Sequence, residues 1–445
     1  MTNDALNLLA DLIGKACTAG ADAADALLVD ASDLSVSLRL GEIESLERSE
    51  SGDLGLRVFI GQRQAVVSST DRSAQALNEL VERAVAMAKL APEDPFCGIA
   101  APEEVAASFP DVESADATEF SAEQLIAKAR AAEDAARAVK GVTNSNGASA
   151  GWGSSRVTLA ASNGFSGSRR RTGYSLSASV LAGEGTGMQS DYEYASRVFA
   201  GDLPDSEWVG RRAGERAVAR LHSRKMQTAR APVFFDPRIS GSLVGALLGA
   251  ISGPSVARGT SFLKDRLGEK IFPEAITIVE DPFRARGLRS RAFDCEGLLP
   301  RKRKLIDAGV LTTWLLDLRS ARQLKMRSTG HAARSPSGPP SPSASNVFME
   351  AGKVSPTELM CDVAQGFYVV ETMGMGINGV TGDYSQSAAG FWIENGQIAF
   401  PVNEMTIAGN LKNMFLNLSA ANDLEFLRGV DAPTLRIDGM TIAGT

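Results

Sequence analysis

The sequence of 445 residues predicts an α+β protein. N-terminal α/β units, first a helix–antiparallel meander–helix and then a helix/strand unit, precede a β-rich C-terminal domain. Apolar residues recur at helical spacing over 4–17 and 73–90, and strand-like runs lie between these two segments. After residue 230, strand runs and glycine turns dominate. We therefore expect three domains, over residues 1–100, 119–225 and 230–445.

The first two units are predicted from short runs and their boundaries. VSLRL, IESLERS, LGLRVFI and QAVVSST predict four strands, separated by turns at Gly41-Glu42, Ser51–Asp53 and Gly61-Gln62. The Pro-, Ala- and acid-rich residues 91–118 predict a linker. A helix over about 121–140 follows, and Ser121 and Gln124 have the spacing of a capping box at its start. Strands at 155–162 and 173–182 and a helix at about 206–221 complete the second unit.

The C-terminal domain carries clear hairpin signals. Asn395-Gly396 supplies a type I′ turn between two alternating runs, and Ala308-Gly309 predicts a second hairpin. A helix is expected at about 239–252, and TLRID and MTIAG predict a final strand pair. HAARSPSGPPSPSASN, residues 331–346, predicts an exposed loop that is either a flexible connection or functional.

Composition excludes several functional classes. The net charge of −7 argues against a general nucleic-acid or membrane-surface binder. The N-terminal segment carries Asp4 and Asp11 and no basic region, so it predicts an amphipathic helix rather than a signal peptide. No apolar run approaches the roughly 18 residues of a membrane span. We expect a cytoplasmic protein without membrane or direct nucleic-acid contact.

Metal-ligand spacing is missing. The only histidines are His222 and His331, far apart in the chain, and the four cysteines are scattered as Cys17, Cys97, Cys295 and Cys361. We therefore expect four free thiols and no metal site built by this chain alone.

Two short motifs lack the context that their chemistry requires. Gly147–Gly151 matches G-x-S-x-G around Ser149, but no strand–turn–helix surrounds it, and a loop is expected there. Gly374–Gly379 matches G-x-G-x-x-G, but the following VTGDYSQSAAG does not predict the helix that a dinucleotide site needs.

Two basic clusters, Arg169–Arg171 and Arg301–Lys304, lie beside strand-like sequence. We interpret them as solvated strand edges that discourage aggregation. Contact with a partner or with nucleic acid is the alternative.

Long segments resemble the TldD/PmbA family, on its PmbA (TldE) branch. GVTGDYSQSAAGFWIENGQIAFPVNEMTIAGNL resembles the family signature. STGHAARSPSGPPSPSASN, ARGTSFLKDRLGEKI, TLRIDGMTIAGT and ESGDLGLRVFIGQRQAVVSST resemble further family segments, in the family's order. The resemblance therefore covers almost the whole chain.

The resemblance implies a cytosolic metalloprotease built from two related chains, also named a modulator of DNA gyrase and linked to maturation of a peptide antibiotic. In the TldD-like chain, zinc is held by an HExxxH helix and a later cysteine. The corresponding positions here read VGALLG, so Val244, Gly245 and Gly249 replace the helix ligands and base. No cysteine lies between Asp423 and Thr434. No catalytic residue, metal or other cofactor is therefore assigned to this chain, and zinc is expected in the TldD-like partner.

Three functions remain open. The first is a non-metal subunit that shapes a chamber for extended peptide, bound as an added β-strand, with a TldD-like partner. The second is a non-enzymatic homodimer that binds peptide or gyrase, and the third is a hydrolase using Ser149 or Cys361. The predicted peptide or partner contacts are Gly382, Asp383, Ser385, Arg258, His331 and Arg334. For Asp383, a turn stabilised by its own backbone hydrogen bond is the simpler alternative.

Overall fold

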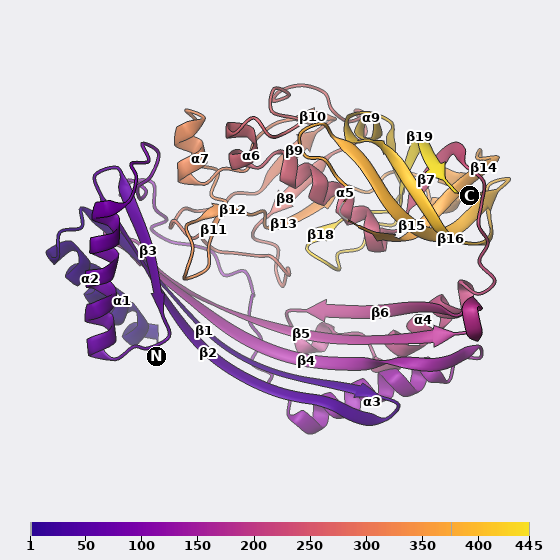
Figure 1. Cartoon of the computed structure of the whole chain (residues 1–445), viewed down its shortest axis with the longest axis horizontal. Helices are drawn as coiled ribbons and strands as arrows, with labels where there is room; N and C mark the ends of the chain where they lie inside the picture. Colours follow the sequence, from indigo (N-terminus) through magenta and orange to yellow (C-terminus); the bar gives the residue numbers. More distant parts are fainter. Residues whose placement is uncertain (1, 375, 445) are drawn as a thin grey trace.

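The computed structural model describes residues 2–374 and 376–444 and shows one large antiparallel sheet beneath a β-rich C-terminal region (Figure 1). The strand order of the sheet is β3-β2-β1-β4-β5-β6. The two units expected at 1–100 and 119–225 thus share one sheet, joined where β1 pairs with β4. Its elements are α1 (Thr2–Thr18), β1 (Ala23–Arg39), β2 (Glu42–Ile60), β3 (Arg63–Ser69), α2 (Ala74–Leu90), α3 (Ala122–Arg137), β4 (Val142–Ala161), β5 (Ser166–Ala182), β6 (Gln189–Arg197) and α4 (Ser206–Ala219).

The meander has three strands, β1, β2 and β3, where the sequence predicted four. The turn predicted at Ser51–Asp53 is wrong, because β2 runs through it and its residues pair with Val29, Asp30 and Ala31 of β1. Likewise β4 and β5 are longer than predicted, and the Gly147–Gly151 motif lies inside β4 rather than in a loop. The capping box at Ser121 and Gln124 is confirmed, with both reciprocal hydrogen bonds present.

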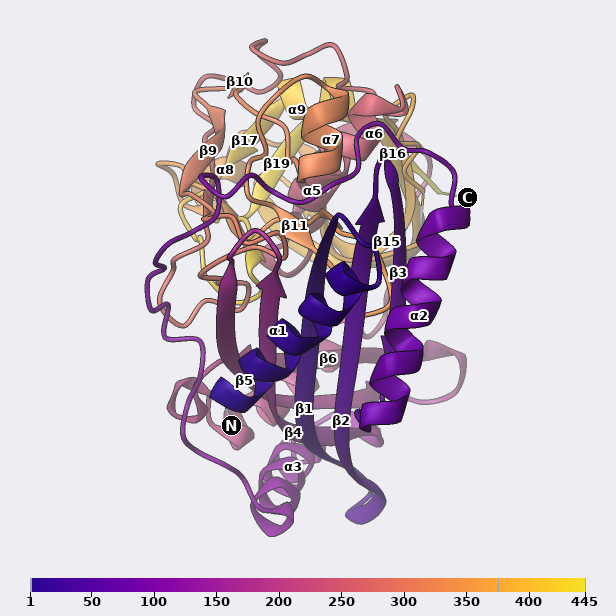
Figure 2. The same cartoon turned by 90° about the vertical axis from the view of Figure 1, so that its left-hand side faces the viewer.

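Alternation along the strands divides the sheet into two faces. On β1, Leu28 packs against α1 and α2, and Val36 packs against α3 and α4. Figures 1 and 2 show these four helices on the convex side of the curved sheet. The opposite face carries Leu27 of β1 and Leu159 of β4, which contact Phe293 of the C-terminal region. The concave face is therefore the one that meets the C-terminal half.

The C-terminal region has one large core between two sheets. In the first sheet, of order β16-β15-β14-β7-β19-β17, β16 also pairs with β19, so the sheet closes on itself like a barrel. The second has the order β10-β9-β8-β13-β18. The bounds are β7 (Ala229–Phe235), α5 (Pro237–Ala250), α6 (Gly253–Ala257), β8 (Ile278–Asp281), β9 (Arg303–Asp307), β10 (Val310–Leu311), α7 (Leu318–Gln323), β11 (Ala332–Ala333), β12 (Ser341–Pro342), β13 (Asn346–Met349), α8 (Pro356–Met360), β14 (Gln365–Met373), β15 (Asp383–Glu394), β16 (Gln397–Asn410), α9 (Leu411–Leu416), β17 (Leu418–Ala420), β18 (Val430–Asp431) and β19 (Leu435–Ala443).

Both predicted hairpins are confirmed. Asn395 and Gly396 have φ of 51° and 76°, as a type I′ turn between β15 and β16 requires. Ala308 and Gly309 turn between β9 and β10 in the same way. The predicted final strand pair is wrong: TLRID and MTIAG form the single strand β19, whose pairing with β7 is irregular between Ile437 and Met440.

The loop over 331–346 is exposed only at its tip. Ala344–Asn346 are buried at one end, and His331 is buried at the other. His331 Nε2 lies 2.6 Å from a Glu280 carboxylate oxygen. Burial alone raises the pKa of Glu280, but hydrogen bonds from His331 and Ser345 outweigh it and lower the pKa to about 2. The loop is therefore an anchored element rather than a flexible connection.

Arg334 of this loop joins the C-terminal half to the large sheet. Its fully buried guanidinium lies 2.6 Å from a carboxylate oxygen of Asp25 on β1. The other Asp25 oxygen accepts a hydrogen bond of 2.9 Å from Arg57 Nε on β2. One buried carboxylate thus holds two arginines from different halves of the chain. Among the described residues, no helix has the length and apolar content to span a membrane.

Asp25→Asn is expected to lower the free energy of unfolding by about 3–5 kcal/mol, because two buried guanidinium groups would lose their counter-charge. Urea unfolding followed by circular dichroism measures the change. Arg48→Gln is the control, since the Arg48–Glu50 pair on β2 is solvent-exposed and its loss should change stability little. An Asp25→Asn variant as stable as the parent would contradict the role of this carboxylate.

The buried carboxyl group of Glu296 makes the stability of the fold depend on pH. It is buried, and burial followed by the nearby Asp294 carboxylate raises its pKa to about 8. The folded state therefore binds more protons than the unfolded state between the ordinary pKa of 4.5 and 8, and this carboxyl lowers stability as the pH rises through that window. Glu296→Gln should gain stability relative to the parent from pH 5 to 9, measured by urea midpoints. A constant difference across this range would show that Glu296 does not titrate as described.

Candidate functional site

Helix α5 forms one wall of a groove. It begins at Asp236, whose side chain accepts a hydrogen bond from the Arg238 backbone amide, and Pro237 occupies the first turn. Leu243, Val244 and Leu247 face the core. Apolar residues on one side and small residues on the other thus orient the helix with one face open.

The open face of α5 borders a cavity of about 620 Å³, which we call the α5 groove. From the helix, the groove is lined by Gly241, Ser242, Gly245, Leu248 and Gly249. The opposite wall includes Arg289 and Ser343–Ala344 of the C-terminal loops and Arg428 and Val430 near β18. The glycines recur every four residues, so they lie along one face of the helix.

The α5 groove does not fit a catalytic zinc. Of the three positions predicted to replace the metal-binding residues, Gly245 and Gly249 line the groove, while Val244 is buried in the core. None has an oxygen, nitrogen or sulfur on its side chain, and catalytic zinc requires three such protein ligands. Within residues 2–374 and 376–444, no group of three or more His, Cys, Asp or Glu side chains has the arrangement of a metal site.

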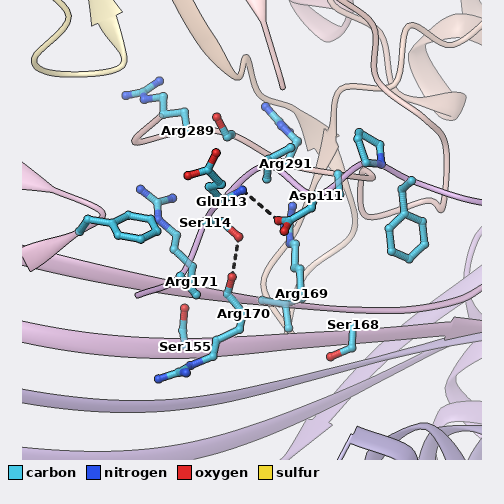
Figure 3. A pocket seen from close by; sticks show the side chains of 18 of the residues that line it. Asp111, Glu113, Ser114, Ser155, Ser168, Arg169, Arg170, Arg171, Arg289 and Arg291 are labelled. Carbon is cyan, nitrogen blue, oxygen red and sulfur yellow. Dashed lines mark hydrogen bonds between the residues drawn. The ribbon is translucent and has the colours of Figure 1, made fainter. Parts of the chain in front are cut away.

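A second, larger cavity of about 890 Å³ adjoins the groove, with Arg289, Ser343 and Ala344 lining both. Its floor is β5, and its roof is the loop around 289–292 (Figure 3). Arg169 and Arg171 rise from β5 into this space, whereas Arg170 extends to the other side of the sheet (Figure 3). Arg169–Arg171 pair with β4, and β6 pairs with β5 only from Tyr174 onward, so the predicted edge position of this cluster agrees with the strand pairing. Arg169 and Arg171 also line a cavity, which the sequence did not predict.

In the second basic cluster, Arg301–Lys304, the two lysines form ion pairs. Lys302 forms an ion pair of 2.8 Å with Asp281, and Lys304 forms one of 2.7 Å with Asp307. Arg303 donates to the Thr329 carbonyl at 2.7 Å. This cluster borders none of the cavities described here.

Three predicted contact residues, Gly382, Asp383 and Ser385, lie together where β15 begins, and the chain after the fourth, Arg258, reaches the same turn. The turn before β15 contains Gly382 and Asp383, and Phe262, just after Arg258, donates its amide to the Gly379 carbonyl at 2.9 Å. Asp383 accepts hydrogen bonds from Thr381 and Asn410, which lower its pKa. Its carboxylate thus links this turn to the start of α9 rather than bonding its own backbone. Ser385 follows on β15, and its amide donates to the Gly376 carbonyl.

The remaining two predicted contacts are buried: His331 is hydrogen-bonded to Glu280, and Arg334 forms an ion pair with Asp25. Their burial gives no support to contact with peptide. The sequence could not reveal this, because their partners Glu280 and Asp25 are distant in the chain.

The third functional hypothesis finds no supporting geometry. Ser149 lies within β4, opposite Ser37 and Ser177, rather than on a strand-to-helix turn. Cys361 is an exposed residue at the end of α8. The G-x-G-x-x-G segment includes Met375, outside the described residues, and after Gly379 the chain enters β15 rather than a helix.

The strand edges of the C-terminal barrel are mostly covered. β16 pairs with β15 on one side, and on the other it meets β19 over Thr406–Ala408 and Arg224 near Val402. β16 therefore offers little open edge for an added peptide strand, while the short terminal strand β17 pairs with β19 on one side. The α5 groove and its neighbouring cavity are the two larger concave surfaces described.

Comparison with known proteins identifies the family to which this chain belongs. Models of the PmbA/TldA metallopeptidase family match residues 24–88 (domain 1), 115–221 (central domain) and 228–444 (C-terminal domain). The chain belongs to this family. Metalloprotease PmbA of Escherichia coli is 38% identical over 95% of this chain and 92% of its own length. A PmbA homologue of Haemophilus influenzae is 37% identical over 96% and 94%.

Solved structures share the fold over the whole chain. A protein of Bacteroides thetaiotaomicron, named as a candidate modulator of DNA gyrase, has a TM-score of 0.91 at 28% identity and covers 99% of this chain and 98% of its own. TldE of Thermococcus kodakarensis has a TM-score of 0.88 at 22% identity, with 98% and 100% covered. The resemblance found in the sequence segments is thus confirmed at the level of the family.

Alanine substitutions at the three glycines of α5 are expected to change the free energy of unfolding in different directions. A Cβ on Gly245 or Gly249 would meet no atom within 4 Å, whereas one on Gly241 would lie 2.5 Å from the Val430 carbonyl oxygen. Gly245→Ala and Gly249→Ala should each raise the free energy of unfolding by about 0.5–1 kcal/mol, the helix-propensity difference. Gly241→Ala should lower it, and thermal unfolding compares the three. Equal effects at all three positions would contradict an open face at Gly245 and Gly249.

Proposed function

We propose that this chain is the non-metal subunit of a two-chain metallopeptidase, shaping the peptide chamber beside a zinc-bearing TldD-like partner. The proposal rests on the open face of α5, which carries no side chain able to bind zinc. At the positions that resemble a zinc-binding segment, the groove is lined by glycine, and no side chain there can hold the metal or act as a base. The chemistry of zinc-activated water would come from the partner.

In this proposal the groove binds and orients an extended peptide. Gly245 and Gly249 leave room for a backbone to approach α5, and Leu248 adds an apolar contact. The surface at Gly382, Asp383, Ser385 and Arg258 remains a candidate for contact with the partner or the peptide. Its turn is held by hydrogen bonds from Thr381 and Asn410 to Asp383, and the amides of Gly382, Asp383 and Ser385 already donate within the chain. The turn therefore offers a preformed surface rather than free amide donors.

Zinc content and peptidase activity test the division of labour. The purified chain should contain only substoichiometric zinc and cleave no peptide. The co-expressed pair should cleave peptide and lose activity with a chelator, because the catalytic metal belongs to the other subunit. Proteolysis by this chain alone that survives chelator would overturn the proposal.

A groove-filling variant adds a structural test. In the co-expressed pair, Gly249→Phe should lower peptidase activity roughly tenfold or more, because small misplacements of substrate strongly reduce rates. Zinc content of the pair should stay unchanged. Asn78→Phe, on the exposed surface of α2 and outside the groove, is the matched control. Equal activity of both variants would remove the groove from the function.

The alternative, a non-enzymatic homodimer that binds peptide or a protein such as gyrase, makes a different prediction for the native state. Purification of the chain from its own cells, with mass identification of copurifying proteins, separates the two. A TldD-like chain favours the subunit, and a stable complex without one favours the homodimer.

A further inference from the structure

The larger cavity concentrates positive charge. We call it the arginine cavity, defined by Arg169 and Arg171 of β5 and by Arg289 and Arg291 of the loop that covers it (Figure 3). Arg291 is only 8% exposed and Arg169 is half-buried, whereas Arg171 and Arg289 are exposed at the mouth of the cavity. The side chains come from segments more than 100 positions apart in the chain, so the fold brings them together.

None of these four guanidinium groups forms an ion pair with a carboxylate among the described residues. Arg169 donates to the Phe293 carbonyl at 3.2 Å, Arg171 to the Leu288 carbonyl, and Arg291 to the Ser343 carbonyl. A neutral carbonyl satisfies one donor of each guanidinium group without supplying a negative charge, although Glu280 and Asp294 lie near enough to Arg291 to act on its pKa. For Arg289, the side chain has no hydrogen bond in the described structure.

The lining of the cavity also contains two carboxylates, of which one is paired with an arginine outside the lining and the other keeps its charge. Glu113 forms an ion pair of 3.1 Å with Arg286. Asp111 accepts a hydrogen bond of 2.9 Å from the Glu113 backbone amide (Figure 3). The two carboxylates therefore do not balance the four arginines.

Mutual repulsion shows how close the cationic groups lie. Burial, and after it the charges of Arg169 and Arg289, lower the pKa of Arg171. Burial also lowers the pKa of Arg291, the nearby Glu280 carboxylate opposes this effect, repulsion from Arg169 adds to it, and Asp294 opposes it further. An anion in the cavity would relieve this repulsion and supply the missing acceptors.

We propose that the arginine cavity binds carboxylate groups of a peptide lying in the adjoining α5 groove, so that acidic peptides are the preferred substrate class. This inference rests on the proposed function, which supplies the peptide. Arg289, Ser343 and Ala344 line both cavities, so one extended chain can occupy both. The volume of the arginine cavity, about 890 Å³, lies in the range of pockets that bind small ligands.

Several features favour peptide carboxylates over a phosphate-rich ligand. The lining also includes Phe109, Val112, Val157 and Phe199, which suit the apolar parts of a peptide. The net charge of the chain is −7, which disfavours a polyanionic nucleic acid. Arginine pairs with carboxylates through two parallel hydrogen bonds, which adds orientation to affinity.

Peptide binding to the full chain, alone and in the co-expressed pair, tests the inference by fluorescence anisotropy. The probes are a labelled Glu/Ser peptide, its Gln/Ser counterpart, and a neutral peptide with a free instead of an amidated C-terminus. The wild type should bind the Glu peptide roughly tenfold or more tightly than the Gln peptide, as expected for charge-assisted pairs. If only the peptide with a free C-terminus binds more tightly, the cavity binds the terminal carboxylate rather than acidic side chains.

The variants Arg289→Gln and Arg171→Gln should remove most of this preference. Arg289 is the first choice because its guanidinium has no hydrogen-bond partner to lose within the described residues. Arg327→Gln makes the same charge change at an exposed site outside both cavities and should keep the preference. Circular dichroism confirms that each variant is folded.

Each other outcome is decisive. Equal binding of Glu and Gln peptides by the wild type would overturn the acidic preference and leave the proposed function standing. Stronger binding of inorganic phosphate or a short oligonucleotide at the same arginines would assign the cavity to phosphate and overturn the inference. Failure of every peptide to bind the chain or the pair would overturn the inference and the proposed function together.

Discussion

The buried carboxylate of Asp25 sets the relation between the two halves of the molecule. It lies on the concave face of the large sheet, with Arg57 beside it on β2 and Arg334 reaching down from the C-terminal loop. A buried charge of this kind is tolerated only when its partners are in place. The loop that carries Arg334 also packs closely on the sheet, since a Cβ on Gly55 would lie 2.0 Å from the Pro336 carbonyl oxygen. Charge pairing and close backbone approach thus fix the same loop.

The position of that loop determines the shape of both cavities. Its residues Ser343 and Ala344 line the α5 groove and the arginine cavity, and the Ser343 carbonyl holds Arg291. At the two ends of the loop, His331 and Ser345 both bond Glu280. A single segment is therefore fastened to the large sheet by Arg334 and to the C-terminal sheet by Glu280. The concave surface between the halves follows from these two attachments.

Local chemistry made much of the fold predictable, and long-range pairing made the rest unpredictable. The Asn395-Gly396 turn and the Ser121 capping box depend on neighbouring residues, so their sequence signals sufficed. Ser51–Asp53 has turn-like composition, but pairing with β1 holds it extended. The arginines of β5 were visible as a cluster, yet only the curvature of the sheet and the position of the loop above show that they enclose a cavity. His331 and Arg334 were expected at the surface because their buried acidic partners are not neighbours in sequence.

The three glycines of α5 are present for different reasons, one for packing and two for the groove. A glycine inside a helix costs about 1 kcal/mol relative to alanine, and such a cost needs a structural or functional reason. For Gly241 the reason is the close approach of the Val430 carbonyl. For Gly245 and Gly249 no neighbouring atom demands the absence of a side chain. The space above them belongs to the groove, and a ligand backbone that approaches the helix there would account for both positions. The helix then retains a fully packed inner face for stability, while its outer face provides room instead of metal ligands.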